Sequence, residues 1–169
     1  MSIQLLDIVL YSHDGKKRTL SLNPGEVNVI TGKSKSGKSA LIAIVDYCLG
    51  SSKCNVPHGI IRKSVSWFGL RIKLASGQGF VARRCPFKTA SSSEDCYIEA
   101  GGSIDIPEFD ILHQNTNSKG VVSTVSDWSG ISENIHIPPE GQTRASLAAT
   151  IRHGLMLCFQ PQDEIIRRA

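Results

Sequence analysis

The chain lacks any long hydrophobic run. Of its 169 residues, 40% are hydrophobic and 20% are charged, which is typical of a globular domain. No stretch approaches the roughly 18 consecutive apolar residues that a membrane-spanning helix needs. The first residues, MSIQ, also lack the charged and apolar regions of a secretory signal peptide. We therefore expect a single-domain cytoplasmic protein that makes no contact with a membrane.

Closely spaced cysteine pairs are also missing. An odd number of cysteines in a chain without an export signal argues against a disulfide framework. Cys54, His58, Cys85 and Cys96 could together supply four zinc ligands, but no CxxC motif is present, and small buried thiols are the simpler interpretation. The five cysteines, all expected to be reduced, are Cys48, Cys54, Cys85, Cys96 and Cys158.

The chain has fewer acidic than basic residues. The 19 Lys and Arg residues exceed the 15 Asp and Glu residues, which gives a formal net charge of +4. The basic residues form short clusters at positions 16–18, 62–63, 83–84 and 167–168. Such clusters suit a polyanion such as DNA, although solvated turns and strand ends have the same composition.

Hydrophobic periodicity predicts a mixture of strands and helices. Alternation over residues 3–10 and 19–22, around a polar turn at 13–16, predicts a β-hairpin. A short apolar strand is expected at 27–30, followed by a helix over 38–49 that Gly50 ends. Residues 65–74 and 80–83, separated by a turn at 76–79, predict an antiparallel pair, and 96–98 a further strand. Apolar spacing predicts one helix around 121–128 and another from about Thr143 to 155.

The most informative motif is GKSKSGKS at residues 32–39, which fits GxxxxGK[ST] in full. It lies between a predicted strand and a predicted helix, so successive backbone N–H groups and the helix N-terminus would face bound phosphates. We expect Lys38 to reach the β- and γ-phosphates of ATP and the Ser39 hydroxyl to complete a Mg²⁺ shell. A chance match in a Ser- and Lys-rich turn is the alternative. The residues expected to bind the nucleotide are Gly32, Lys33, Ser34, Lys35, Ser36, Gly37, Lys38, Ser39 and Ala40.

Other classes of P-loop protein fit less well. The guanine-reading motif NKxD is absent, which disfavours GTP. A small-molecule kinase usually starts with the loop and continues as alternating βα units, whereas here a hairpin precedes the loop and antiparallel strands follow it. A self-contained kinase and a non-hydrolysing nucleotide- or DNA-binding module stay open as alternatives.

Several segments resemble a known family. A hairpin, PGEVNVITGKSKSGKS, an antiparallel sheet, a helix and FQPQDEI follow one another as in the N-terminal half of an ABC-type ATPase head of the SMC-like group. More narrowly, YSHDGKKRTLSL, GKSALIAIVDYCLGSS, VPHGIIRKSVSWFGL and CFQPQDEIIRR resemble SMC-like ATPases of bacterial anti-phage and related three-component operons, of which Lamassu is one. The similarity is strong around the loop and FQPQDE and weak over residues 88–142. Lys35 departs from the Gly or Asn found in many such loops.

The resemblance implies roles for further residues. Gln162 would be the Q-loop glutamine that senses Mg²⁺ and the γ-phosphate and, with Lys38, would serve catalysis; Gln160 is the second choice. Tyr11, Ser12 and His13 lie where related heads place residues near the base or the phosphates. A solvated hairpin turn explains His13 equally well, and a polar residue at a strand end would explain Gln162.

The motifs that complete an ABC head are missing from these residues. No Ser-Gly-Gly signature is found. Asp163 and Glu164 do not qualify as a Walker B Asp with its catalytic Glu, because Pro161 separates them from the apolar run before them. The resemblance therefore implies an α/β P-loop NTPase lobe with an antiparallel β subdomain, the rest of the head and its coiled coil lying elsewhere. Its partners would be a second head, DNA and other subunits encoded in a defence operon. The expected divisions within 1–169 are 1–31 (hairpin and strand), 32–50 (loop and helix), 60–100 (antiparallel strands) and 143–165 (helix and Q-loop).

Overall fold

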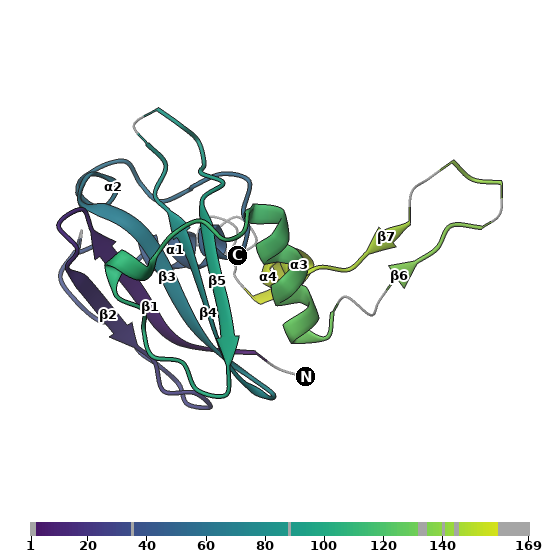
Figure 1. Cartoon of the computed structure of the whole chain (residues 1–169), viewed down its shortest axis with the longest axis horizontal. Coiled ribbons are helices and arrows are strands. Elements are labelled where there is room, and N and C mark those ends of the chain that lie inside the picture. The colour runs from purple at the N-terminus through teal and green to yellow at the C-terminus, as the bar shows by residue number, and fades with distance from the viewer. Residues whose placement is uncertain are drawn as a thin grey trace.

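The protein has a mixed α/β architecture built on a five-stranded antiparallel sheet with the strand order β2-β1-β3-β4-β5 (Figure 1). The computed structural model describes residues 3–34, 36–87, 89–131, 135–139, 141–143 and 146–158, with residues 156–158 described by their backbone only. The five strands are β1 (Gln4–Ser12), β2 (Lys17–Ser21), β3 (Val65–Leu74), β4 (Gly77–Arg84) and β5 (Cys96–Gly101).

The helices lie outside the sheet. They are α1 (Ala40–Cys48), α2 (Ile60–Ser64), α3 (Ser118–Ser129), α4 (Ile151–Cys158) and the 3₁₀ helix η1 (Phe109–Ile111). A two-stranded hairpin of β6 (Ile135–His136) and β7 (Leu147–Ala148) projects away from the main body (Figure 1). No helix in the described part of the chain has the length and apolar character needed to cross a bilayer.

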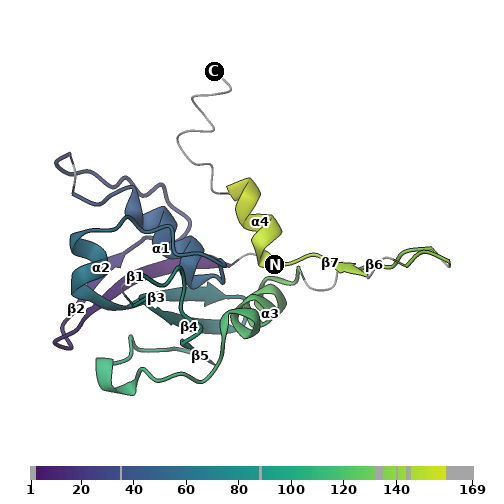
Figure 2. The same ribbon diagram turned by 90° about the horizontal axis from the view of Figure 1, so that it is seen from above.

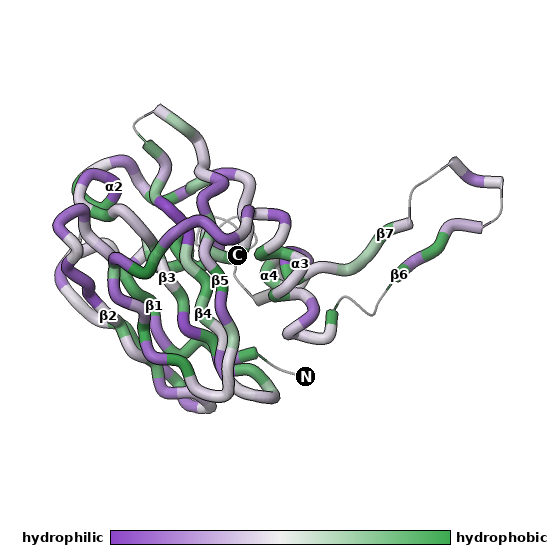
Figure 3. Tube along the Cα trace, in the orientation of Figure 1, coloured by the Kyte–Doolittle hydropathy of each residue, from purple (hydrophilic) through white to green (hydrophobic). Residues whose placement is uncertain are grey.

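Two apolar layers cover the two faces of the sheet. Successive side chains of a strand point to opposite faces, so in β1 Ile8 packs in one layer and Val9 in the other. The first layer contains residues of α1, α3 and α4, and the second contains residues 104–112 around η1. Figure 2 shows α1 and η1 on opposite sides of the sheet, and Figure 3 shows hydrophobic residues concentrated along the central strands.

Arg83, on β4, is buried in the first layer with 0% of its surface exposed. Its guanidinium lies 4.1 Å from the Tyr47 ring centroid. It donates hydrogen bonds to the carbonyls of Tyr47 (2.9 Å), Ser51 (2.6 Å) and Ser93 (2.8 Å). The side chain therefore donates to carbonyl groups at and after the C-terminal end of α1 and ties α1 to the sheet. The Tyr47 carbonyl also accepts from the Gly50 N–H at 3.2 Å.

Most of the predicted elements are confirmed. The first hairpin, the antiparallel pair of β3 and β4, and helices near 40–48 and 118–129 are all present. β5 extends the strand expected at 96–98. The four cysteines at 48, 54, 85 and 96 are free, and all but Cys85 are buried. The side chain of Cys158 lies outside the described residues.

Two predictions of secondary structure were wrong. Residues 27–30 form no strand, and Val27 is 92% exposed, because no neighbouring strand in the described chain offers backbone hydrogen bonds. The last helix begins at Ile151 rather than near Thr143, since Leu147 and Ala148 pair with β6. The range 60–100 contains the predicted antiparallel strands and also the short helix α2, which was not predicted.

Gly50 ends α1, as predicted, in a conformation with φ +90°. A Cβ at this position would lie 2.3 Å from Val122 Cγ2, so α1 and α3 approach each other closely here. Gly50→Ala should lower the free energy of unfolding by about 1–3 kcal/mol, because it combines strain with overpacking. Urea denaturation measures this change. Gly102→Ala, at a position with open space around it, should change the stability by less than about 0.5 kcal/mol; equal stability of both variants would contradict the close approach.

Candidate functional site

Residues 32–39, here called the glycine loop, connect the irregular segment after β2 to the start of α1. The chain between β2 and α1 stands away from the sheet on the outside of the molecule (Figure 2). Ser39 is the N-cap of α1, but its side chain makes no capping hydrogen bond. The loop therefore leads directly into the N-terminus of a helix, where backbone N–H groups favour anions.

Lys38 curls back over the loop that carries it. Its Nζ donates to the carbonyls of Gly32 and Lys33, each at 2.8 Å, and to Ser36 Oγ at 3.3 Å. The loop is curved enough for an ammonium group to bridge carbonyls five and six residues away in sequence. A positive charge is thereby held within the curve of the glycine loop.

Gly37 is required where the loop meets α2. Its φ is +88°, a conformation that L-residues rarely adopt, and a Cβ would lie 3.3 Å from Ile61 Cδ1. The short helix α2, which sequence patterns did not reveal, therefore packs directly against the loop.

A cavity of about 650 Å³ lies between the loop and the first hairpin. We call it the hairpin-side cavity. Three of its lining residues, Lys16, Arg18 and Lys38, are basic, and Asp14 is acidic. Asp14 Oδ2 pairs with Lys16 Nζ at 2.7 Å. Hydrogen bonds from Lys16 and then Ser12 lower the pKa of Asp14 to about 2. With Asp14 ionised, the lining keeps an excess of positive charge at neutral pH, which suits a polyphosphate.

Strand register explains why Arg18 reaches this cavity. Leu10 of β1 pairs with Arg18 of β2, so both side chains lie on the same face of the hairpin. Both line the hairpin-side cavity. The site thus includes Lys16 and Arg18, for which the sequence predicted only a basic cluster and no place in the nucleotide site. Period-2 spacing from Ser12 through the turn was the signal that could have placed them.

A second cavity of about 660 Å³ lies on the other side of the loop, against residues 57–61. We call it the α2-side cavity. It shares Lys38 with the hairpin-side cavity, so this side chain is accessible from both. The loop and helix residues that line the α2-side cavity are Ser34, Ser36, Gly37, Lys38, Ser39 and Ala40.

Ser39 has the properties of a ligand for Mg²⁺ accompanying a nucleotide. Its side chain is exposed, and no capping hydrogen bond engages it. A hydroxyl oxygen is the hard ligand type that Mg²⁺ prefers, with phosphate oxygens and water completing the octahedron. Within the described ranges, no group of three or more His, Cys, Asp or Glu side chains is arranged to hold a metal. Cys54, His58, Cys85 and Cys96, the possible zinc ligands, therefore do not form such a group.

The structure separates some of the residues that the resemblance had placed together. Ser12 lines the hairpin-side cavity, but His13 lines a different cavity, described below. Tyr11 is fully buried on the far face of the sheet, where its hydroxyl donates to the Pro107 carbonyl at 2.8 Å. Lys35, Gln160 and Gln162 lie outside the described residues.

The basic clusters also differ from one another in the structure. Arg83 is fully buried and hydrogen-bonded to backbone carbonyls, so its suggested role as a phosphate contact is wrong. Its neighbour Arg84 is exposed. The cluster at 167–168 falls outside the described residues.

No protein-family model, curated protein or solved structure matches this chain.

Proposed function

We propose that this chain binds ATP with Mg²⁺ at the glycine loop and forms the nucleotide-binding lobe of an SMC-like ABC ATPase head. The observation that carries ATP binding is the position of Lys38, whose ammonium lies within the curve of a complete GxxxxGK[ST] motif at the start of α1. In the bound state, the Lys38 ammonium would donate its hydrogen bonds to the γ-phosphate instead of to the loop carbonyls. The basic lining of the hairpin-side cavity supports the same ligand class.

Exposed apolar residues before the loop support the assignment as one lobe. Val27 is 92%, Val29 76% and Ile30 41% exposed, in a segment that has no regular secondary structure and no strand partner in the described chain. Alternating apolar residues left in water favour pairing with a further strand. We propose that a strand from the rest of the head pairs with this segment and covers these side chains.

Hydrolysis in this proposal needs groups from outside the described residues. The glycine loop supplies phosphate binding and charge, but positioning an attacking water requires further side chains. Gln162, or Gln160, would be the first; the rest of this head would supply the Walker B Asp and catalytic Glu, and a second head would supply the signature segment. ATP would hold two heads together around DNA, and in a defence system other subunits of the operon would join them. The antiparallel sheet disfavours the kinase alternative, which needs parallel βα units.

The role of Ser39 gives a test of the nucleotide site. ATP should bind the wild-type chain more tightly with Mg²⁺ than with EDTA, and Ser39→Ala should remove most of that difference, about tenfold in Kd or roughly 1.4 kcal/mol. Isothermal titration calorimetry measures both affinities.

Ser52→Ala is the matched control, because Ser52 is exposed and lies outside both cavities that flank the loop. It should keep the full Mg²⁺ effect. Magnesium-independent ATP binding by the wild-type chain would contradict the assignment of the metal site.

A further inference from the structure

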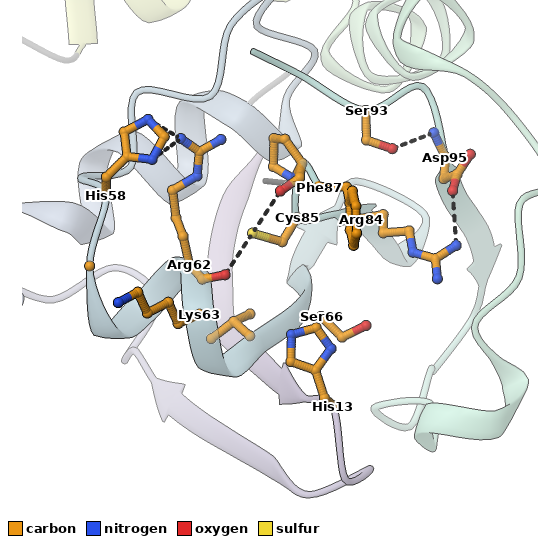
Figure 4. A pocket seen from close by; sticks show the side chains of 13 residues that line it. His13, His58, Arg62, Lys63, Ser66, Arg84, Cys85, Phe87, Ser93 and Asp95 are labelled. Atoms are coloured by element: carbon orange, nitrogen blue, oxygen red, sulfur yellow. Dashed lines mark hydrogen bonds and ion pairs between the residues drawn. The ribbon is translucent and has the colours of Figure 1, made fainter. Parts of the chain in front are cut away.

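A third cavity, of about 730 Å³, lies beside the α2-side cavity and is lined by a different set of side chains (Figure 4). We call it the basic cleft. Its walls come from the turn after β1, the residues leading into α2 and α2 itself, the end of β4 and the segment before β5. His58 and Gly59 line both the basic cleft and the α2-side cavity. The two cavities are therefore neighbours, but no residue of the glycine loop lines the basic cleft.

Positive charge dominates the lining of the basic cleft. A single carboxylate, Asp95, lines it, and its Oδ2 pairs with Arg84 Nη1 at 3.1 Å. The basic side chains of the lining are His13, His58, Arg62, Lys63 and Arg84.

Two of these cations have no carboxylate partner. Among the described residues, no salt bridge involves Arg62 or Lys63. The guanidinium of Arg62 instead faces the His58 ring, with Nη1 at 2.7 Å from Nε2, and donates from Nη2 to the Ala90 carbonyl at 3.3 Å. Figure 4 shows Arg62 and Lys63 on one side of the cleft and Arg84 with Asp95 on the other. The cleft thus keeps two uncompensated positive charges even when both histidines are neutral.

Nucleophilic chemistry at Cys85 does not account for this arrangement. Cys85 lines the cleft, but burial raises the pKa of its thiol, so the thiol stays protonated at neutral pH. A protonated thiol is a poor nucleophile. The lining therefore suits binding of an anion.

We propose that the basic cleft binds the terminal phosphate of a nucleotide, at a site separate from the glycine loop. A phosphate monoester carries a charge of about −1.5 to −2 at pH 7, which the unpaired charges of Arg62 and Lys63 match, whereas each diester in a nucleic-acid backbone carries only one. Guanidinium groups and ammonium groups are the usual protein partners of phosphate. Phe87 lines the same cleft and is 75% exposed, and aromatic side chains stack on bases.

Titration of AMP without Mg²⁺ into the whole chain tests this site. Arg62→Ala/Lys63→Ala should weaken AMP binding at least about tenfold, because both unpaired cations are lost. Lys38→Ala should leave AMP binding within about twofold of the wild type. Phe87→Ala should weaken the binding of AMP but not of inorganic phosphate.

The matched control removes two positive charges elsewhere. Lys53→Ala/Lys73→Ala changes two exposed residues that do not line the cleft and should leave AMP affinity unchanged. Lys63→Glu, at an exposed position, repeats the test with one substitution if the double variant fails to fold. Unaltered AMP binding in the cleft variants, or an equal loss in Lys38→Ala, would overturn the proposal.

Oligonucleotides identify the source of the phosphate. Tighter binding of a short 5′-phosphorylated oligothymidylate than of AMP would assign the cleft to a strand end, and the reverse would assign it to free mononucleotides; both results support a terminal-phosphate site. Equal binding of oligothymidylates with a 5′-phosphate and with a 5′-hydroxyl would show recognition of the diester backbone and overturn it. Loss of Mg²⁺-ATP binding at the glycine loop leaves these outcomes unaffected, so the two sites are tested independently.

Discussion

Lys38→Ala should weaken binding of Mg²⁺-ATP at least about 100-fold, or roughly 2.7 kcal/mol. The variant loses the ammonium that lies 2.8 Å from the loop carbonyls of Gly32 and Lys33, and with it the charge-assisted hydrogen bonds expected to the β- and γ-phosphates. Isothermal titration calorimetry on the purified chain gives the affinities directly.

Lys53→Ala is the control for this substitution. It removes the same charge from an exposed position that lines neither cavity beside the glycine loop, so it should change ATP affinity by less than about twofold. The thermal transition of Lys38→Ala should stay close to that of the wild type, because the side chain lies outside both apolar layers. Undiminished ATP binding by Lys38→Ala would contradict the proposed role of the loop.

Arg83→Met should lower the free energy of unfolding by about 2–4 kcal/mol. The guanidinium is 0% exposed and donates to the carbonyls of Tyr47, Ser51 and Ser93. Methionine fills much of the same volume but donates no hydrogen bond, so the Ser51 and Ser93 carbonyls would lose their Arg83 donor, whereas the Tyr47 carbonyl would keep the Gly50 N–H. Urea denaturation followed by circular dichroism measures the change.

The adjacent arginine provides the comparison. Arg84 pairs with Asp95 at 3.1 Å, but its side chain is 56% exposed, so Arg84→Met should cost less than about 1 kcal/mol. A similar loss of stability in both variants would mean that the buried hydrogen bonds of Arg83 contribute no more than an exposed ion pair.

Local patterns predicted the elements whose partners are close in sequence. The alternation around residues 13–16 predicted a hairpin, and the apolar spacing before Gly50 predicted α1, because both depend on neighbouring residues. Residues 27–30 have the same apolar pattern as a strand but form none, since a strand needs hydrogen bonds from a second strand.

Strand pairing between β6 and β7 determines the secondary structure of the residues before α4. The apolar residues Leu147 and Ile151 are spaced as on one helical face, yet Leu147 pairs with His136 in the β6–β7 hairpin. The helix begins after Thr150, whose N–H and hydroxyl both contact His153 Nδ1. A pairing over this sequence distance leaves no local pattern by which to predict it.

The candidate site also combines features that local sequence predicts with features that depend on distant residues. The motif at 32–39 predicted the position of the proposed phosphate-binding loop, but the surroundings of this loop depend on tertiary structure. Arg18 reaches the hairpin-side cavity through the pairing register of β1 and β2, and Ile61 reaches Gly37 through α2, a helix of only five residues. Neither contact follows from residue spacing alone.

The backbone amides of the glycine loop provide the most direct test of nucleotide binding. In a ¹H–¹⁵N correlation spectrum of the 169-residue chain, Mg²⁺-ATP should cause its largest shift changes at the amides of residues 32–40, because phosphate oxygens would accept hydrogen bonds from them. Unchanged positions for these amides at saturating Mg²⁺-ATP would contradict binding of the phosphates by this loop.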